Sequence, residues 1–191
     1  MAKPEIYVSI DIESDGPYPP RYSMLSLGAA AFHRGRYEPV ATFEVNLLPL
    51  DGAERDPKTM EWWATQPAAW EHLQESRQSP SDAMEAFAAW ASALPGKPIL
   101  AVYPVWDWGW VNYYLQQFHG RNPFGIAALD MKTLAMALLD SEFKASAKRN
   151  MPREWFDGAP RHDHTARTDA IGQGVMLMRM FDRLHALHGA E

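Results

Sequence analysis

Residues 5–13 read Glu-Ile-Tyr-Val-Ser-Ile-Asp-Ile-Glu, a run rich in β-branched residues. Such a run is typical of a β-strand, and the Ser-Asp-Gly sequence at 14–16 indicates that the strand leads into a loop. Side chains two positions apart in a strand lie on the same face, so Asp11 and Glu13 point the same way. The end of this strand therefore offers two carboxylates to one cation.

Two interpretations of Asp11 and Glu13 remain open at this point. The pair either lies on a solvated strand face or binds a metal ion. Tyr7 and Ser9 share the same face, which indicates a partly covered strand, and unpaired charge is costly under such cover. A bound cation would relieve that cost.

The rest of the chain alternates between strand and helix signals. Further strands are predicted at 23–33 and 37–47, joined by a hairpin turn at 33–36. The pattern then predicts a helix at 79–94, a strand at 99–103, a helix beginning near Asp107, a short apolar stretch at 126–129, a helix at 130–139, irregular structure at 143–163 and a final helix at 165–187. This order predicts an α/β fold with a mixed β-sheet flanked by helices, and residues 1–191 as a single domain.

Composition limits the chemistry that the protein can perform. The chain has no cysteine, so a metal would bind through oxygen and imidazole ligands, which favours Mg²⁺ or Mn²⁺. The net charge of -6 argues against an extended basic surface for gripping nucleic acid. It does not exclude a nuclease, because bound cations supply their own positive charge.

The hydropathy of the chain bears on its location. No apolar run approaches the roughly 20 residues that span a bilayer. The first residues, Met-Ala-Lys-Pro, lack the apolar core of a signal peptide. We expect a cytoplasmic protein without a membrane partner.

Asp107 lies at the start of a predicted helix with a dense set of aromatic residues around it. Carboxylates are favoured at helix N-termini, so a helix cap is one interpretation, and a metal ligand is the other. Trp106 and Trp108 flank Asp107, and Trp110 follows. Most of these rings suit core packing, and one or two, such as Trp108, would stack on a nucleobase.

Asp169 interrupts an apolar helix face. In helical steps it shares a stripe with Gln173, Met176 and Met180, so a carboxylate stands at the N-terminal end of a core-facing surface and needs a partner. The small residues Ala170, Gly172 and Gly174 would let this helix approach the sheet closely and bring Asp169 towards the first strand.

His164 lies five residues before Asp169, just before the predicted helix. An imidazole has an intrinsic pKa near 6.5, which suits proton transfer at neutral pH. The neighbouring His162 is the alternative candidate for the base. A second interpretation is that both histidines belong to a polar loop of titratable residues without a catalytic role. The spacing from Asp169 favours His164.

The ordered set of Asp-Ile-Glu at 11–13, Asp107 after a central strand, and His-Thr-Ala-Arg-Thr-Asp-Ala at 164–170 resembles the DEDDh subgroup of DnaQ-like 3'-to-5' exonucleases. Small stand-alone bacterial exoribonucleases are the most similar members. The resemblance spans residues 5 to about 180 and implies a ribonuclease H-like fold. It implies that two Mg²⁺ or Mn²⁺ ions are held by the carboxylates of Asp11, Glu13, Asp107 and Asp169, with His164 as general base.

The activity implied is hydrolysis of single-stranded nucleic acid, preferably RNA, from its 3' end to nucleoside 5'-monophosphates. Glu13 belongs to the catalytic group as well as to the metal ligands. Met24 and Leu25 are candidates for packing against the terminal base, with Trp62 and Trp63 as weaker ones. For all four, core packing is the alternative.

Other functions compatible with these residues are a DNA-directed exonuclease, a phosphoesterase of small nucleotides, and a non-catalytic nucleic-acid-binding protein that keeps the fold. The complete set of five site residues argues against the last. The resemblance also implies a homodimer.

Overall fold

A five-stranded mixed sheet forms the centre of the computed structural model, which describes residues 3–189. The strand order is β3-β2-β1-β4-β5. β1 pairs antiparallel with β2, which pairs antiparallel with β3, while β4 runs parallel to β1 and to β5. The strands are β1 Glu5–Ser14, β2 Met24–Phe32, β3 Ala41–Asn46, β4 Lys97–Val102 and β5 Leu129–Asp130. The predicted α/β class with a mixed sheet is confirmed, and the strand predicted at 5–13 is β1.

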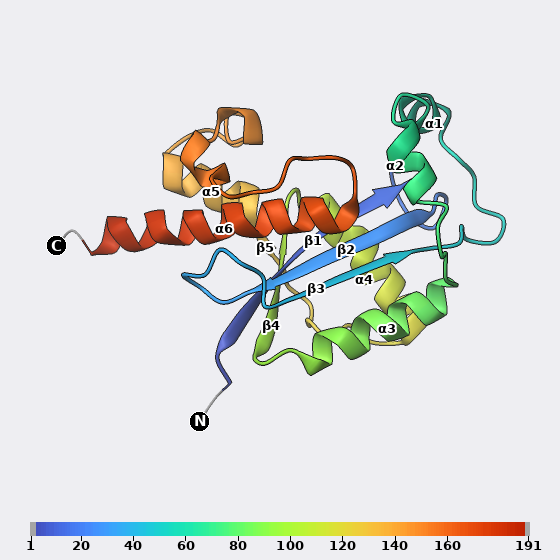
Figure 1. Ribbon diagram of the computed structural model, residues 1–191, viewed down its shortest axis with the longest axis horizontal. Coiled ribbons are helices and arrows are strands. Elements are labelled where there is room, and N and C mark those ends of the chain that lie inside the picture. The colour runs from blue at the N-terminus through green and yellow to red at the C-terminus, as the bar shows by residue number, and fades with distance from the viewer. Residues whose placement is uncertain (1–2, 190–191) are drawn as a thin grey trace.

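Helices cover both faces of this sheet. Helix α6, Ala166–His188, runs along β1 and β2, whereas α3, Pro80–Ala93, and α4, Trp106–Tyr114, lie on the opposite side (Figure 1). The alternation of β1 produces this division. Its even-numbered residues from Ile6 to Ile12 are buried in the same cluster as residues of α3 and α4. Its odd-numbered residues therefore face α6.

The close contact between α6 and β2 depends on glycine. A Cβ atom on Gly28 in β2 would lie 2.0 Å from the backbone carbon of Ala166, at the start of α6. A Cβ atom on Gly174 would lie 2.0 Å from the Phe32 ring. The predicted role of small residues is thus borne out at Gly174, whereas Gly172 faces Ala159 and Pro160 instead of the sheet.

Three helices begin at side-chain caps. Asp56 caps α1, Pro57–Trp63, and Asp130 caps α5, Met131–Leu139, in each case by accepting hydrogen bonds from backbone N–H groups of the first turn. Ser79 caps α3 in the same way. The other helical elements are α2, Pro67–His72, a π-helical turn at Leu115–His119, and 3₁₀ turns at Lys148–Asn150 and Arg153–Phe156.

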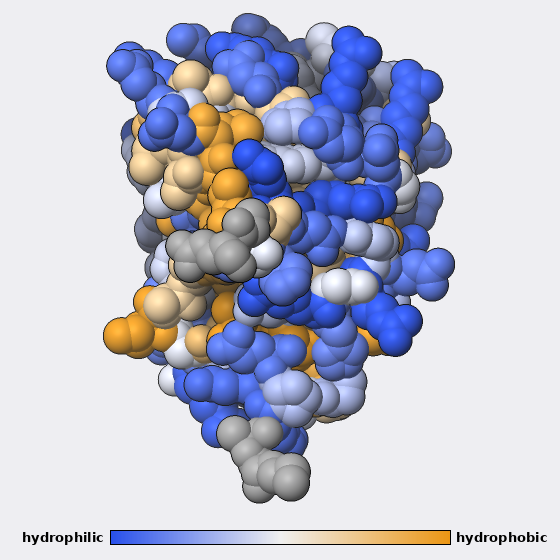
Figure 2. All heavy atoms as spheres, turned by 90° about the vertical axis from the view of Figure 1, so that its left-hand side faces the viewer, coloured by the Kyte–Doolittle hydropathy of each residue, from blue (hydrophilic) through white to orange (hydrophobic). Residues whose placement is uncertain are grey.

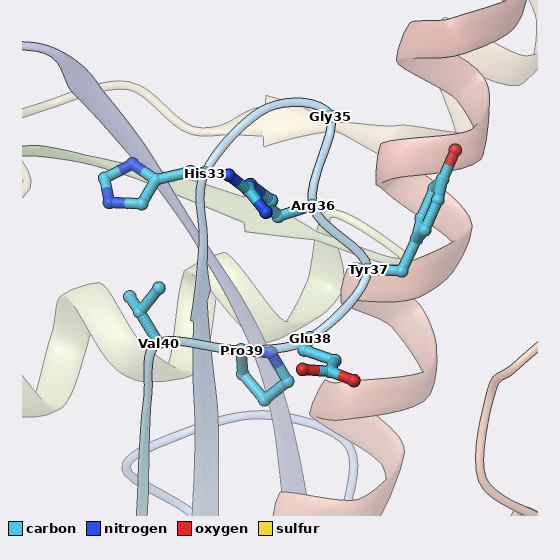
Figure 3. Close-up of a pocket in the computed structure, with 7 residues that line it drawn as sticks. All are labelled: His33, Gly35, Arg36, Tyr37, Glu38, Pro39 and Val40. Carbon is cyan, nitrogen blue, oxygen red and sulfur yellow. The ribbon is translucent and has the colours of Figure 1, made fainter.

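The connection between β2 and β3 is longer than the predicted hairpin turn at 33–36. β3 begins only at Ala41, and residues 33–40 form an arch beside α6 (Figure 3). The Tyr37 hydroxyl donates a hydrogen bond to the Asp182 carboxylate, and the Arg179 guanidinium carbon lies 3.8 Å from the centre of the Tyr37 ring. The predicted turn at 33–36 is present and is closed by a hydrogen bond from the Arg36 N–H to the His33 carbonyl at 3.0 Å. Residues 37–40, which were predicted to begin the next strand, belong to the arch instead.

The apolar stretch predicted as an element at 126–129 is also corrected. Only Leu129 and Asp130 pair with β4. Ile126 is 96% exposed and precedes the strand. Apolar character alone does not place a residue inside, because much of a protein surface is apolar.

Figure 2 shows the side of the molecule on which the described chain starts and stops. The end at which the described chain starts and stops is mostly hydrophilic, with limited apolar areas (Figure 2). None of the helices within residues 3–189 is long and apolar enough to cross a membrane.

Candidate active site

Four carboxylates from distant parts of the chain meet beside the end of β1. Ligand atoms of Asp11, Glu13 and Asp169 all lie within 4.8 Å of one another. Asp107, on the first turn of α4, lies near enough for its charge to raise the pKa of Glu13. We refer to these four residues as the carboxylate cluster.

Asp11 and Glu13 lie on a covered face of β1, not on a solvated one. Gln173 of α6 donates a hydrogen bond from Nε2 to Asp11 Oδ1 at 2.6 Å. On the same face, Ser9 is fully buried and the Tyr7 ring centre lies 4.7 Å from that of Phe181. The solvated-face interpretation is therefore wrong.

Asp107 does not cap its helix. The N-cap of α4 is Val105, and no side chain caps this helix. The Asp107 side chain is only 3% exposed, and its Oδ2 atom has no hydrogen-bond partner within residues 3–189. A buried carboxylate oxygen without a partner is costly, which is the condition that a bound cation relieves.

Burial and mutual repulsion raise the pKa values of the carboxylate cluster. Burial, followed by the charge of Asp169, raises the pKa of Asp11 to about 7. Burial also raises the pKa of Glu13 and that of Asp107 well above their usual range, with the charge of Asp11 acting in the same direction. Full ionisation is therefore unfavourable until positive charge arrives.

The cluster fits divalent cations. The Asp169 Oδ2 atom, like that of Asp107, is buried and has no partner among the described residues. Carboxylate oxygens are the donors that Mg²⁺ and Mn²⁺ prefer. Asp11, Glu13, Asp107 and Asp169 are thus the residues able to hold such ions.

Two histidines lie next to the cluster. His162 Nδ1 is 2.5 Å from Asp169 Oδ1, although the His162 side chain is 64% exposed. His164 adopts a left-handed backbone with φ of 60°, and its ring packs edge-on against His162 and Trp62, at centroid distances of 4.2 and 4.9 Å. Burial and the charge of His162 lower the pKa of His164, which keeps it a proton acceptor.

The structure adds Lys148, which the sequence patterns did not single out. The residue is partly buried at the start of a 3₁₀ turn, and burial lowers the pKa of its ammonium group. The negative charges of Asp11, Asp169 and Asp107 raise the pKa of Lys148, so the ammonium is close enough to interact electrostatically with the cluster. It falls in the aperiodic segment 143–163, where no sequence signal marked this lysine.

Met24 and Leu25 lie inside the protein. Met24 is 0% and Leu25 is 3% exposed, because β2 is buried over its whole length. The Met24 N–H donates to the Tyr114 hydroxyl at 2.8 Å. Neither side chain presents surface to a substrate base, so the prediction that they contact one is corrected to core packing.

The tryptophans divide into packed and exposed ones. Trp63 is buried and donates from Nε1 to the Ser14 carbonyl at 2.9 Å, and Trp108 is partly buried against the core. Trp62 and Trp106 are 40% and 41% exposed. Trp62 also packs against His164, so it is an exposed aromatic residue next to the site.

Comparison with known proteins places this arrangement in a family. A family model described as 3'-5' exoribonuclease Rv2179c-like domain matches residues 6–180. The chain belongs to this family. It is also 32% identical, over 184 residues, to the 3'-5' DNA exonuclease Cap18 of Escherichia coli, with 94% of this chain and 93% of that protein covered.

Solved structures share the fold of this Rv2179c-like protein. The nuclease domain of 3'hExo, a DEDDh family member bound to rAMP, has a TM-score of 0.73 at 11% identity, covering 93% of this chain and 92% of that one. Pop2p from S. pombe, in a form with Mg²⁺ and Mn²⁺ bound, has a TM-score of 0.61 at 16% identity, covering 93% and 83%. These matches confirm the predicted ribonuclease H-like fold.

The family membership establishes the general activity. The protein is a 3'-to-5' exonuclease that acts on nucleic acid. The DEDDh-type fold and the all-oxygen carboxylate cluster imply that it uses divalent metal.

Proposed function

We propose that this protein hydrolyses single-stranded RNA from its 3' end, using two divalent cations, and releases nucleoside 5'-monophosphates. The observation that carries the proposal is the convergence of Asp11, Glu13 and Asp169 within 4.8 Å, with Asp107 beside them. Buried carboxylate oxygens without hydrogen-bond partners are suited to bind cations. A pair of bound cations is suited to phosphodiester hydrolysis.

Each member of the site has a role in this proposal. Asp11, Glu13, Asp107 and Asp169 hold the metal ions, which when bound stabilise developing negative charge and make water more acidic. His164 accepts the proton of the attacking water. The lowered pKa of His164 supports this role, because the ring is neutral and free to accept at pH 7.

The packing of His164 supports a mobile base. Its contacts are edge-on ring packing against Trp62 and His162, and no hydrogen bond fixes the ring to another residue between 3 and 189. His162 holds the position beside Asp169 instead. We propose that His162 yields this position when metal and substrate bind.

The preference for RNA rests on the family description, which is of an exoribonuclease. The second candidate is a DNA exonuclease, and the similarity to Cap18, a 3'-5' DNA exonuclease, favours it. Both candidates use the same cluster and differ only in how the sugar is recognised.

A strand-shortening assay tests the function. RNA and DNA of one sequence, labelled at the 5' end, are incubated with Mg²⁺ or Mn²⁺ and, separately, with EDTA. We expect stepwise shortening of the RNA that EDTA abolishes. Faster shortening of the DNA would select the second candidate, and binding without any shortening would overturn both.

Matched variants link the activity to the site. Asp11→Asn removes one charge from the cluster and should reduce turnover at least about 10²-fold. Glu5→Gln changes a carboxylate at the opposite, exposed end of the same strand and should leave the rate unchanged. Equal rates for the two variants would mean that the metal site lies elsewhere.

A further inference from the structure

Lys148 carries a positive charge that the proposed metal chemistry does not use. Its ammonium makes no hydrogen bond and no ion pair within 4.0 Å to any residue from 3 to 189. Its charge nevertheless interacts with those of Asp11, Asp107 and Asp169. The group is thus close to the carboxylate cluster but separated from it by a gap.

Tyr103 holds Lys148 in this place by two contacts. The Tyr103 hydroxyl accepts a hydrogen bond from the Lys148 backbone N–H at 2.8 Å. The Lys148 Nζ atom lies 4.7 Å from the centre of the Tyr103 ring, a cation–π arrangement. Because Tyr103 directly follows β4, the sheet itself fixes the lysine.

A pocket of about 260 Å³ lies between Lys148 and Asp169 of the cluster. Its other polar lining residues are His162 and Gln173, and the rest of its lining is apolar or small: Phe156, Ala159, Pro160, Gly172 and Met176. Gln173 is 3% exposed, and its Oε1 atom has no hydrogen-bond partner in the described structure. Pockets that enclose a drug-sized ligand usually measure 300–1,000 Å³, so this pocket has room for only part of a nucleotide.

Charge balance indicates what the ammonium meets. The four ionised carboxylates carry a charge that two divalent cations cancel, so Lys148 leaves the loaded site with one positive charge. A phosphodiester carries one negative charge. The single positive charge of Lys148 therefore complements the single negative charge of the scissile phosphate. The space between Lys148 and the cluster leaves room for a phosphate oxygen.

We propose that Lys148 is a catalytic residue whose ammonium donates a hydrogen bond to a non-bridging oxygen of the scissile phosphate. The proposal rests on the proposed function, since it places the phosphate at the carboxylate cluster. After cleavage the same phosphate belongs to the released nucleoside 5'-monophosphate. Lys148 therefore contacts the product as well as the substrate.

Product binding tests this contact independently of turnover. Lys148→Met removes the charge while keeping an unbranched stem beside Tyr103. With Mn²⁺ present, the affinity for AMP and UMP should fall about 10- to 100-fold, the range for a hydrogen bond to a charged group. The affinity for adenosine and uridine, which lack the phosphate, should stay within about twofold. Isothermal titration calorimetry measures both.

Turnover and two further lysine variants complete the test. Lys148→Met should lower kcat about 10²-fold, as expected when a donor to transition-state charge is removed. Lys148→Arg, which keeps the charge, should recover most of the AMP affinity. Lys144→Met, an exposed lysine on the same segment, is the matched control and should behave as wild type.

Two results would overturn the proposal. Wild-type AMP affinity in Lys148→Met would do so, and so would equal losses of AMP and adenosine binding. Tighter Mn²⁺ binding with unchanged AMP affinity would show that Lys148 only offsets carboxylate repulsion. If Lys148→Met loses its cooperative thermal transition, Lys148→Gln replaces it in the same measurements. Absence of strand shortening by the wild-type enzyme would instead reject the proposed function, whatever the AMP affinities.

Discussion

The Asp11 carboxylate is expected to make the metal-free protein sensitive to pH. Its pKa in the fold is about 7, above the value of 3.8 that it has when exposed. A raised pKa means that the protonated form is favoured in the folded state, so its contribution to stability is present below pH 3.8 and is lost as the pH rises to 7. In the absence of metal, the ionised carboxylates of the cluster thus lower the stability of the fold.

Thermal melting in EDTA between pH 4 and pH 8 measures this effect. We expect the Tm to fall as the pH rises, and we expect Asp11→Asn to reduce the fall by roughly several degrees because one titrating charge is gone. Glu5→Gln provides the comparison. A wild-type slope in Asp11→Asn would show that Asp11 does not carry the raised pKa.

The two histidines predict different losses of activity. His164→Ala should lower kcat about 10²- to 10⁴-fold, the usual contribution of a general base. His162→Ala should cost less than about tenfold, because we propose that His162 gives up its contact with Asp169 when metal and substrate bind. Steady-state kinetics on one labelled strand compares them. A larger loss for His162→Ala would reverse the assignment.

At the scale of elements, the contact between β2 and α6 fixes the position of Asp169. Gly28→Ala would place a methyl group 2.0 Å from the Ala166 backbone, which cannot move without displacing the start of α6. We expect a loss of about 1–3 kcal/mol in the free energy of unfolding and a larger relative loss of turnover. Urea unfolding and strand shortening measure the two effects.

Gly109→Ala is the control for this variant. Beyond its chain neighbours and the adjacent helix backbone, a Cβ atom there meets no described atom within 4 Å, and Gly109 is exposed on α4. An alanine inside a helix should leave stability unchanged or slightly raised. Similar behaviour of the two variants would show that α6 tolerates displacement.

Local patterns predicted the elements that carry most of the site. The period of two in β1 paired Asp11 with Glu13, and helical phasing placed Asp169 on the buried face of α6. The same patterns failed where a residue is placed by distant contacts. Lys148 owes its position to Tyr103, and the arch at 33–40 owes its shape to α6, so neither could be inferred from its neighbours in sequence.

For the whole molecule, divalent cations should act as stabilising ligands. Ions that bind the folded but not the unfolded chain raise stability by mass action. We expect Mg²⁺ or Mn²⁺ at 100 times its Kd to add about 2.7 kcal/mol to the wild-type protein, seen as a higher Tm. The Asp169→Asn variant should lose most of this gain, and an equal gain in both proteins would contradict the metal site.

The separation of the site residues along the chain has a consequence for synthesis. Gln173 on α6 and its partner Asp11 on β1 are 162 positions apart. Until α6 has left the ribosome and docked, Asp169 is missing and the cluster holds only part of its charge. A chain without α6 lacks Asp169, so we expect nuclease activity to appear only after α6 has docked on the sheet.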